Sequence, residues 1–175
     1  MHDLDAAEPE RRADAVRALA ESGGPTAADA LRGALEDPDE RVRAAAAVGL
    51  GQVGDPGALD ALIRTIDDAP DEMHLDSTPA VGALGAMGLK AVPPLLDLLE
   101  SPEQLTRLHA QRALELAVYR RHGFVPGRGF PNDEAEEAAR EELTSSDYQF
   151  DAEPAERAAA IERLRDRFDL RPAQS

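Results

Sequence analysis

Few residues in this chain have side chains suited to catalysis, and they are scattered. The sequence has no cysteine and four histidines, so thiolate nucleophiles, disulfides and cysteine-ligated metals are excluded. A protein-bound iron pair can be held by histidine–glutamate dyads, which supply the imidazole and carboxylate ligands that iron prefers. Here Leu75 follows His74 and Ala110 follows His109, so we expect no bound metal.

Motifs for nucleophilic or phosphate chemistry are also missing from the sequence. No Gly-x-Ser-x-Gly turn and no phosphate-binding glycine-rich loop occurs. Gly127-Arg128-Gly129 fits an ordinary loop. We therefore expect no catalytic residue, no cofactor and a non-catalytic role.

Two candidate ligand-binding residues, His74 and Asp76, lie in a segment that we predict below to be helical. Asp76 aligns with apolar Val42 of the preceding repeat. A carboxylate in an apolar column needs a hydrogen-bond partner or solvent. Thr78 or an arginine of a neighbouring repeat would satisfy it, and contact with a ligand is the alternative.

A basic segment between residues 103 and 130 is the second candidate site. Its charged residues are Arg107, Arg112, Arg120, Arg121, Arg128, Glu103 and Glu115. The segment after it, residues 133–142, is strongly acidic. We favour pairing between the two segments within the molecule. The alternative is a site for an anionic partner, with Arg107 and Arg112 as its contacts.

The charge of the whole chain limits the classes of partner. There are 35 acidic and 19 basic residues, which give a formal net charge of −16. This disfavours nucleic acid and anionic membranes, both of which attract clustered cations. The N-terminus lacks the basic and apolar regions of a signal peptide, and no run approaches a membrane span. We expect a soluble, cytoplasmic protein that does not bind membranes.

Internal self-similarity decides the expected architecture. Leu50-Gly51 matches Leu84-Gly85, and Gly54 matches Gly88, 34 residues further on. An earlier copy aligns at a spacing of 31, and a looser copy begins near residue 101. Glycines and prolines lie at the positions in each copy where helices are expected to end and begin.

These glycines and prolines, together with the spacing of apolar residues, predict a series of consecutive helices. Val42, Ala45, Ala46, Gly49 and Leu50 fall on one helical face. The predicted helices are 8–22, 26–36, 39–53, 57–67, 71–87, 90–100, 102–121, 133–143 and 154–168. A proline within the fifth, Pro79, is expected to kink it. The fold class is therefore all-α.

Residues 37–66, with the run ERVRAAAAVGLGQVGDPGALDAL, resemble a HEAT repeat of the subtype found in phycobilisome linker lyases. The resemblance implies an α-solenoid of stacked antiparallel helix pairs. It also implies a polar ladder between neighbouring repeats, in which Arg43 and Asp55 occupy the usual positions. The third repeat departs from this pattern, because Ser77 stands where the arginine is expected.

The segment after residue 122 breaks the repeat pattern. All aromatic residues lie at or after Tyr119, and they make up only 3% of the chain. A terminal repeat exposes an apolar end that must be covered. We predict a repeat array over residues 1–122, with about four helix pairs, and an atypical helical cap over 123–175. A binding pocket in the cap is the alternative.

We expect a scaffold or adaptor that binds a protein partner along a concave face lined by the second helices of the pairs. The predicted contacts are Asp29, Arg32, Asp60, Arg64 and Asp97. One alternative is a lyase-like or cofactor-handling subunit, suggested by the repeat subtype. Another is an acidic regulator that occupies basic surfaces of its partner.

Overall fold

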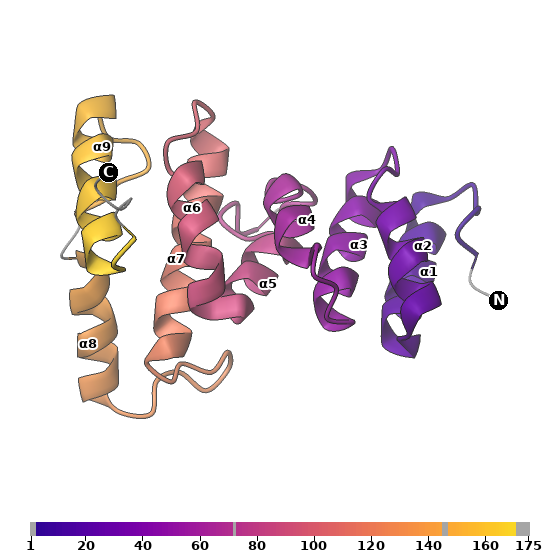
Figure 1. The fold of residues 1–175 in the computed structure, drawn as a ribbon, viewed down its shortest axis with the longest axis horizontal. Coiled ribbons are helices and arrows are strands. Elements are labelled where there is room, and N and C mark those ends of the chain that lie inside the picture. Colours follow the sequence, from indigo (N-terminus) through magenta and orange to yellow (C-terminus); the bar gives the residue numbers. More distant parts are fainter. Residues whose placement is uncertain (1–2, 72, 145–146, 171–175) are drawn as a thin grey trace, which may run out of the picture. The chain divides into compact units, whose positions relative to one another are not determined.

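Helices make up the fold in the part of the chain that the structure describes. The structure is a computed structural model that describes residues 3–71, 73–144 and 147–170 (Figure 1). Its elements are α1 (Pro9–Ser22), α2 (Pro25–Ala34), α3 (Glu40–Gln52), α4 (Ala58–Arg64), α5 (Pro79–Met87), the 3₁₀-helix η1 (Gly88–Ala91), α6 (Val92–Leu98), α7 (Gln104–Arg121), α8 (Asp133–Thr144) and α9 (Pro154–Arg167). No β-strand occurs among these residues, so the all-α prediction is confirmed.

The helix ends follow from local chemistry. Pro9 and Pro154 begin α1 and α9, where the missing backbone donor of proline costs nothing. Asp39 caps α3 by accepting a hydrogen bond from the Arg41 amide at 2.9 Å. Gly23 ends α1 with a φ of 68°, a conformation that glycine adopts without steric cost.

The contacts divide the chain into two compact units, Met1–Ala83 and Leu84–Ser175. The boundary predicted at residue 122 was based on the repeats in the sequence, whereas this division is based on contacts between residues in the structure. Residues on both sides of position 122 therefore belong to one C-terminal unit. The two units are described separately below.

In the N-terminal unit two helix pairs, α1–α2 and α3–α4, pack side by side. The first helices, α1 and α3, make the most extensive contact. Small and branched side chains fill the core, in which Val16, Leu31, Val42, Leu50 and Leu62 are almost completely buried.

One arginine of each first helix makes the same set of hydrogen bonds. Arg12 pairs with Asp37 at 2.8 and 2.9 Å, and Arg43 pairs with Asp68 at 2.9 and 2.8 Å. Each Nη1 also donates to the carbonyls six and five residues earlier. The hydrogen bond from Arg12 lowers the pKa of Asp37 and raises that of Arg12 itself.

Asp55 therefore does not supply the acceptor of Arg43 in the ladder that the resemblance implied. Asp55 instead accepts a hydrogen bond from Arg32, and its other oxygen accepts the Gly57 amide at 2.8 Å. The turn holds Asp55 close to its own backbone, while Asp68 lies after the second helix and reaches the next arginine. A ladder exists, but it uses the aspartates at 37 and 68.

The prediction of one helix over 71–87 was also wrong, because α5 begins only at Pro79. Thr78 caps it: the Thr78 hydroxyl accepts the Val81 amide at 3.1 Å and donates to the Ile66 carbonyl at 2.8 Å. Pro79 therefore begins a helix and does not kink one. Asp76 lies in a turn, outside any apolar helical column.

The C-terminal unit packs α6 and η1 against α7, and α7 against α8. Leu95, Leu96, Leu99, Ile161 and Leu164 are among its most buried side chains. At Gly85 a Cβ atom would lie 2.5 Å from the Cβ of Leu116. A glycine is thus required where the end of α5 meets α7.

Arg107 of α7 repeats the arrangement of Arg12 and Arg43. Its Nη1 donates to the Ser101 and Pro102 carbonyls at 2.8 Å. Its Nε donates to the Phe150 carbonyl at 2.7 Å, which takes the place of the aspartate in the earlier repeats. Nearby, the Tyr148 hydroxyl donates to the Leu99 carbonyl at 2.9 Å.

One described segment, Pro79–Leu98, is long and apolar enough to cross a membrane by length and composition, with a mean hydropathy of 1.3. This differs from the expectation that no run approaches a membrane span. The segment is not one continuous α-helix, because η1 separates α5 from α6. Core helices of water-soluble proteins pass the same test.

Candidate protein-binding surfaces

A groove between α1 and α3 is the main concave feature of the N-terminal unit. Its volume is about 350 Å³. Ala13, Ala20, Ala45 and Gly49 form a floor of small, buried residues. A Cβ atom at Gly49 would lie 3.0 Å from both Ala20 and Leu31, so the absence of larger side chains lets the two helices approach closely.

Long polar side chains surround this apolar floor. Glu10, Arg17, Arg41 and Gln52 also line the groove. Arg41 donates to Glu10 at 3.0 Å and to Asp39 at 3.0 Å. The Arg41 hydrogen bond lowers the pKa of Asp39, which lies outside the groove lining. The rim itself carries one acidic side chain, Glu10, and two arginines. An apolar floor with an arginine-containing rim is the composition of protein interface cores and their borders.

The loop before α5 displays two large apolar side chains. Met73 is 86% exposed and Leu75 is 64% exposed. Asp71 organises the loop: its amide donates to the Ser77 carbonyl at 2.9 Å, and its carboxylate accepts the Met73 amide at 2.8 Å. The residues at the two ends of this segment, Ala69 and Pro79, both line the groove.

His74 and Asp76, the predicted ligand-binding pair, also belong to this loop. His74 Nδ1 lies 3.2 Å from an oxygen of Asp71. The pKa of Asp71 is lowered, chiefly by the hydrogen bond from the Met73 amide and then by His74. Asp76 is only half-buried and has interactions of its own. Both residues therefore fit a role in stabilising the conformation of this loop.

Four of the predicted partner contacts lie on α2 and α4. Arg32 pairs with Asp29 and with Asp55. Arg64 lies 3.6 Å from Glu36, and Asp60 is exposed. Together they form a polar surface of exposed residues whose arginines already have acidic neighbours.

The other predicted contacts lie in the C-terminal unit. Asp97 accepts a hydrogen bond from Arg165 of α9 at 3.2 Å. Arg107 is 7% exposed and donates to backbone carbonyls, which leaves little of its side chain for the anionic partner that was the alternative to pairing within the molecule. Arg112 pairs with Glu115 of its own helix at 3.0 Å.

A second concavity, of about 410 Å³, lies among α7, α8 and α9. Leu114, Leu143 and Leu164 contribute apolar surface, and Tyr119 and Arg140 contribute polar groups. Gln111 also lines it, and its Oε1 is buried without a hydrogen-bond partner. The sequence left a binding pocket in the cap as an alternative, but it did not identify the lining residues, because they come from three separate helices. Across the described ranges, no group of three or more potential metal ligands occurs.

Residues 3–74 match the family described as HEAT repeats. The match covers α1 to α4 and ends before α5, so it supports the interpretation of a HEAT-repeat protein. It does not reach the level of a subtype, and the resemblance to phycobilisome linker lyases stays a prediction. None of the curated proteins matches the chain.

Proposed function

We propose that this chain is a non-catalytic protein-binding module, with the groove between α1 and α3 as its binding site. The observation that carries the proposal is the groove's apolar floor inside a charged rim. The match to HEAT repeats supports it, because stacked helical repeats present extended surfaces to partners. This differs from the sequence expectation, which placed the partner on α2, α4 and α6.

The partner in this proposal is a protein segment with one or two large apolar side chains. Those side chains enter the groove and cover its alanine methyl groups, while the partner backbone or polar side chains meet Arg17, Arg41 and Gln52. Met73 and Leu75 extend the apolar contact beyond the groove. Burial of such side chains supplies most of the affinity at an interface core.

Substitutions that obstruct the groove test the proposal. Val48 lines the groove and is half-buried, and Gln52 lines it and is exposed. Val48→Arg and Gln52→Arg place a long cationic chain at the site. Thr26→Arg adds the same charge at an exposed position of α2 and serves as the matched control. Circular dichroism and the melting temperature show whether each variant is folded.

The readout is affinity capture from the native lysate, at low and moderate salt, with mass spectrometry of the retained proteins. We expect a stoichiometric partner with the wild type and Thr26→Arg, and its loss with Val48→Arg and Gln52→Arg. Equal capture by all of these proteins would exclude the groove. Selective loss in an Arg32→Ala/Arg64→Ala variant would instead place the partner on α2 and α4.

A cofactor-handling role is the second candidate, and the pocket among α7, α8 and α9 is the observation that favours it. Its volume of about 410 Å³ lies within the range of small-molecule sites. Native mass spectrometry and absorbance of the purified protein test this role. A copurifying ligand or chromophore would favour it, and a colourless, ligand-free protein would count against it.

The third candidate, an acidic regulator, rests on the net charge of −16. It predicts capture of basic partners whose retention falls steeply with salt. Retention that survives moderate salt would count against it.

A further inference from the structure

Most arginines in the described chain have an acidic or carbonyl partner, as expected in a chain with 35 acidic residues. Four cations of the C-terminal unit differ: Arg167, which ends α9, and three that belong to η1, α7 and the loop after α7. Lys90 in η1, Arg120 in the last turn of α7 and Arg128 in the loop after α7 are exposed. Among the residues that the structure describes, no hydrogen bond or ion pair involves any of these three side chains.

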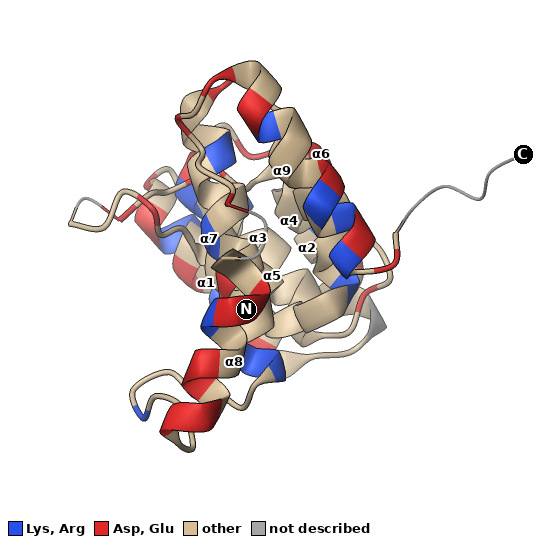
Figure 2. Cartoon of the chain, turned by 90° about the vertical axis from the view of Figure 1, so that its left-hand side faces the viewer, with Lys and Arg blue, Asp and Glu red and all other residues tan. Residues whose placement is uncertain are grey.

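The pairing expected between the basic and acidic segments is only partly present. Arg121 donates to Glu142 at 2.8 Å, and His122 lies 2.7 Å from the other oxygen of the same carboxylate. The first turn of α8 carries Asp133, Glu134 and Glu136, and Figure 2 shows acidic residues at the start of this helix. None of these carboxylates pairs with Arg120 or Arg128.

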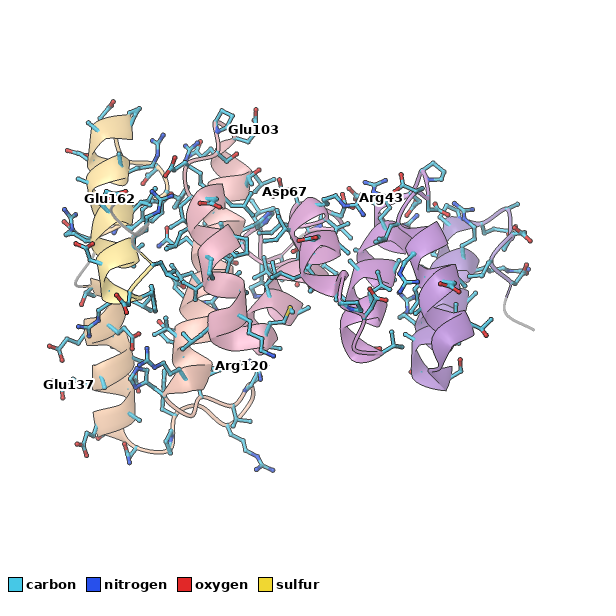
Figure 3. All side chains as sticks on the ribbon, viewed as in Figure 1. Arg43, Asp67, Glu103, Arg120, Glu137 and Glu162 are labelled. Atoms are coloured by element: carbon cyan, nitrogen blue, oxygen red, sulfur yellow. The ribbon has the colours of Figure 1, made fainter. Side chains whose placement is uncertain are left out.

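Aromatic packing holds the loop that carries Arg128 against the end of α7. The Tyr119, Phe124 and Phe130 rings lie with centroids 5.1 to 5.8 Å apart. The Phe124 amide donates to the Tyr119 carbonyl at 2.9 Å. Val125 and Gly129 pair across a tight turn, with Arg128 between them. The loop is thus anchored beside Arg120, which Figure 3 shows near the lower end of α7.

Lys90 lies in η1, which joins α5 to α6. η1 packs against α7, and Gly85, shortly before η1, lies against Leu116. Lys90 comes five residues after Gly85, and Arg120 comes four residues after Leu116. Two exposed apolar side chains accompany the cations: Leu89 is 46% exposed and Val125 is 48% exposed.

We propose that Lys90, Arg120 and Arg128, with Leu89 and Val125, form a docking site for an acidic protein segment that also carries apolar side chains. Charge complementarity selects this occupant, because the carboxylates of the partner meet three cations that no acid of the described chain neutralises. Nucleic acid fits less well. Bases need free aromatic faces for stacking, and the three nearby rings pack on one another.

The alternative role of Arg120 is to stabilise α7, since cations near a helix C-terminus interact favourably with the helix dipole. That role does not account for Arg128 or Lys90, which lie outside α7. The docking site is independent of the groove between α1 and α3, because it belongs to the other unit. The two proposals can therefore fail separately.

Fluorescence anisotropy with labelled peptides tests the site in the full chain. The probes are a peptide of glutamate and leucine, a peptide of glutamate and glycine of equal length, and an oligothymidylate. We compare the wild type, Arg120→Gln/Arg128→Gln, Lys90→Gln and the control Arg11→Gln/Arg167→Gln. The control removes the same two charges from exposed positions.

We expect the glutamate–leucine peptide to bind the wild type and the control equally, with an affinity that falls as salt rises. Binding should weaken by at least about tenfold in Arg120→Gln/Arg128→Gln and by less in Lys90→Gln. The glutamate–glycine peptide should bind more weakly than the glutamate–leucine peptide. Absence of binding, equal loss in the control, or tighter binding of oligothymidylate would overturn the proposal.

Discussion

At the scale of single residues, one arginine position explains much of how neighbouring elements are joined. Arg12, Arg43 and Arg107 each bind two carbonyls just before their own helix and one acceptor that lies later in the chain. The acceptors are Asp37, Asp68 and the Phe150 carbonyl. An arginine suits this position because its planar group donates in several fixed directions.

Substitution of Arg43 by alanine should therefore destabilise the N-terminal unit. The change removes four hydrogen bonds and leaves Asp68, a carboxylate whose side chain is 15% exposed, without its partner. We expect the free energy of unfolding to fall by about 2 kcal/mol, measured by urea unfolding.

The matched control is Arg64→Ala. Arg64 and Glu36 are both largely exposed and lie 3.6 Å apart, and exposed pairs of this kind contribute little. Equal effects of the two substitutions would show that the Arg43 hydrogen bonds do not stabilise the unit.

In the C-terminal unit, Tyr148 also joins two segments that lie far apart in the sequence. It is 7% exposed, and its hydroxyl donates to the Leu99 carbonyl. Burial raises its pKa to about 12, above the usual value near 10. The folded state holds the phenol proton more tightly than the unfolded state, so this contribution to stability is complete below about pH 10 and is lost as the pH rises toward about 12.

Tyr148→Phe should lower the free energy of unfolding by about 1 kcal/mol at neutral pH and reduce its decline at alkaline pH. Urea unfolding near pH 8 and near pH 10.5 measures both effects. The reference is the decline of the wild type, and Tyr119→Phe measures the share of a second tyrosine whose pKa is raised by burial. An unchanged alkaline decline in Tyr148→Phe would contradict the assignment.

At the scale of elements, two glycines of α3 have different roles. A Cβ at Gly49 would lie 3.0 Å from Ala20 and Leu31, whereas nothing lies within 4 Å of a Cβ at Gly51. Both glycines lower helix propensity, but only Gly49 makes room for α1 and α2.

Alanine substitution at these two positions should have opposite effects. Gly49→Ala should destabilise the protein by about 1 kcal/mol, because overpacking outweighs the gain in helix propensity. Gly51→Ala should stabilise it by somewhat less than about 1 kcal/mol. The urea midpoints of the two variants measure these opposite changes in stability. Stabilisation by both substitutions would show that α1 and α2 move apart at little cost to accommodate a methyl group at position 49.

At the scale of the whole molecule, the excess of acid is the dominant property. With 35 acidic and 19 basic residues, repulsion between carboxylates destabilises the folded chain at low salt. Most of the ion pairs involve at least one exposed partner, as in Arg17–Asp14 and Arg140–Glu136. Such pairs lose little when they are screened.

Potassium chloride should therefore raise the melting temperature. Between about 0.05 M and about 1 M salt the screening length falls severalfold, and we expect a rise of a few degrees. Differential scanning fluorimetry measures it, with sucrose of equal osmolality as the control for solute exclusion. A falling melting temperature would mean that the ion pairs outweigh the general repulsion.

The amino-acid sequence was enough to predict the features that depend on residues close along the chain. Apolar residues at three- and four-residue spacing, with prolines and glycines at the ends, predicted α1, α3, α7, α8 and α9 to within about two residues. The repeat spacing predicted paired helices, and the HEAT match over residues 3–74 supports that prediction. Local periodicity suffices here because helix formation and capping involve residues close along the chain.

Which distant groups meet depends on how the helices pack in the folded chain. Arg43 pairs with Asp68 and not with Asp55. Helix α5 begins at Pro79, after Thr78, whose hydroxyl caps the helix and reaches the Ile66 carbonyl. Arg107 is buried while Arg120 remains exposed. The groove between α1 and α3 likewise depends on how closely two helices approach at Gly49. Such contacts depend on the packing of side chains from separate helices, and the order of residues along one helix does not specify them.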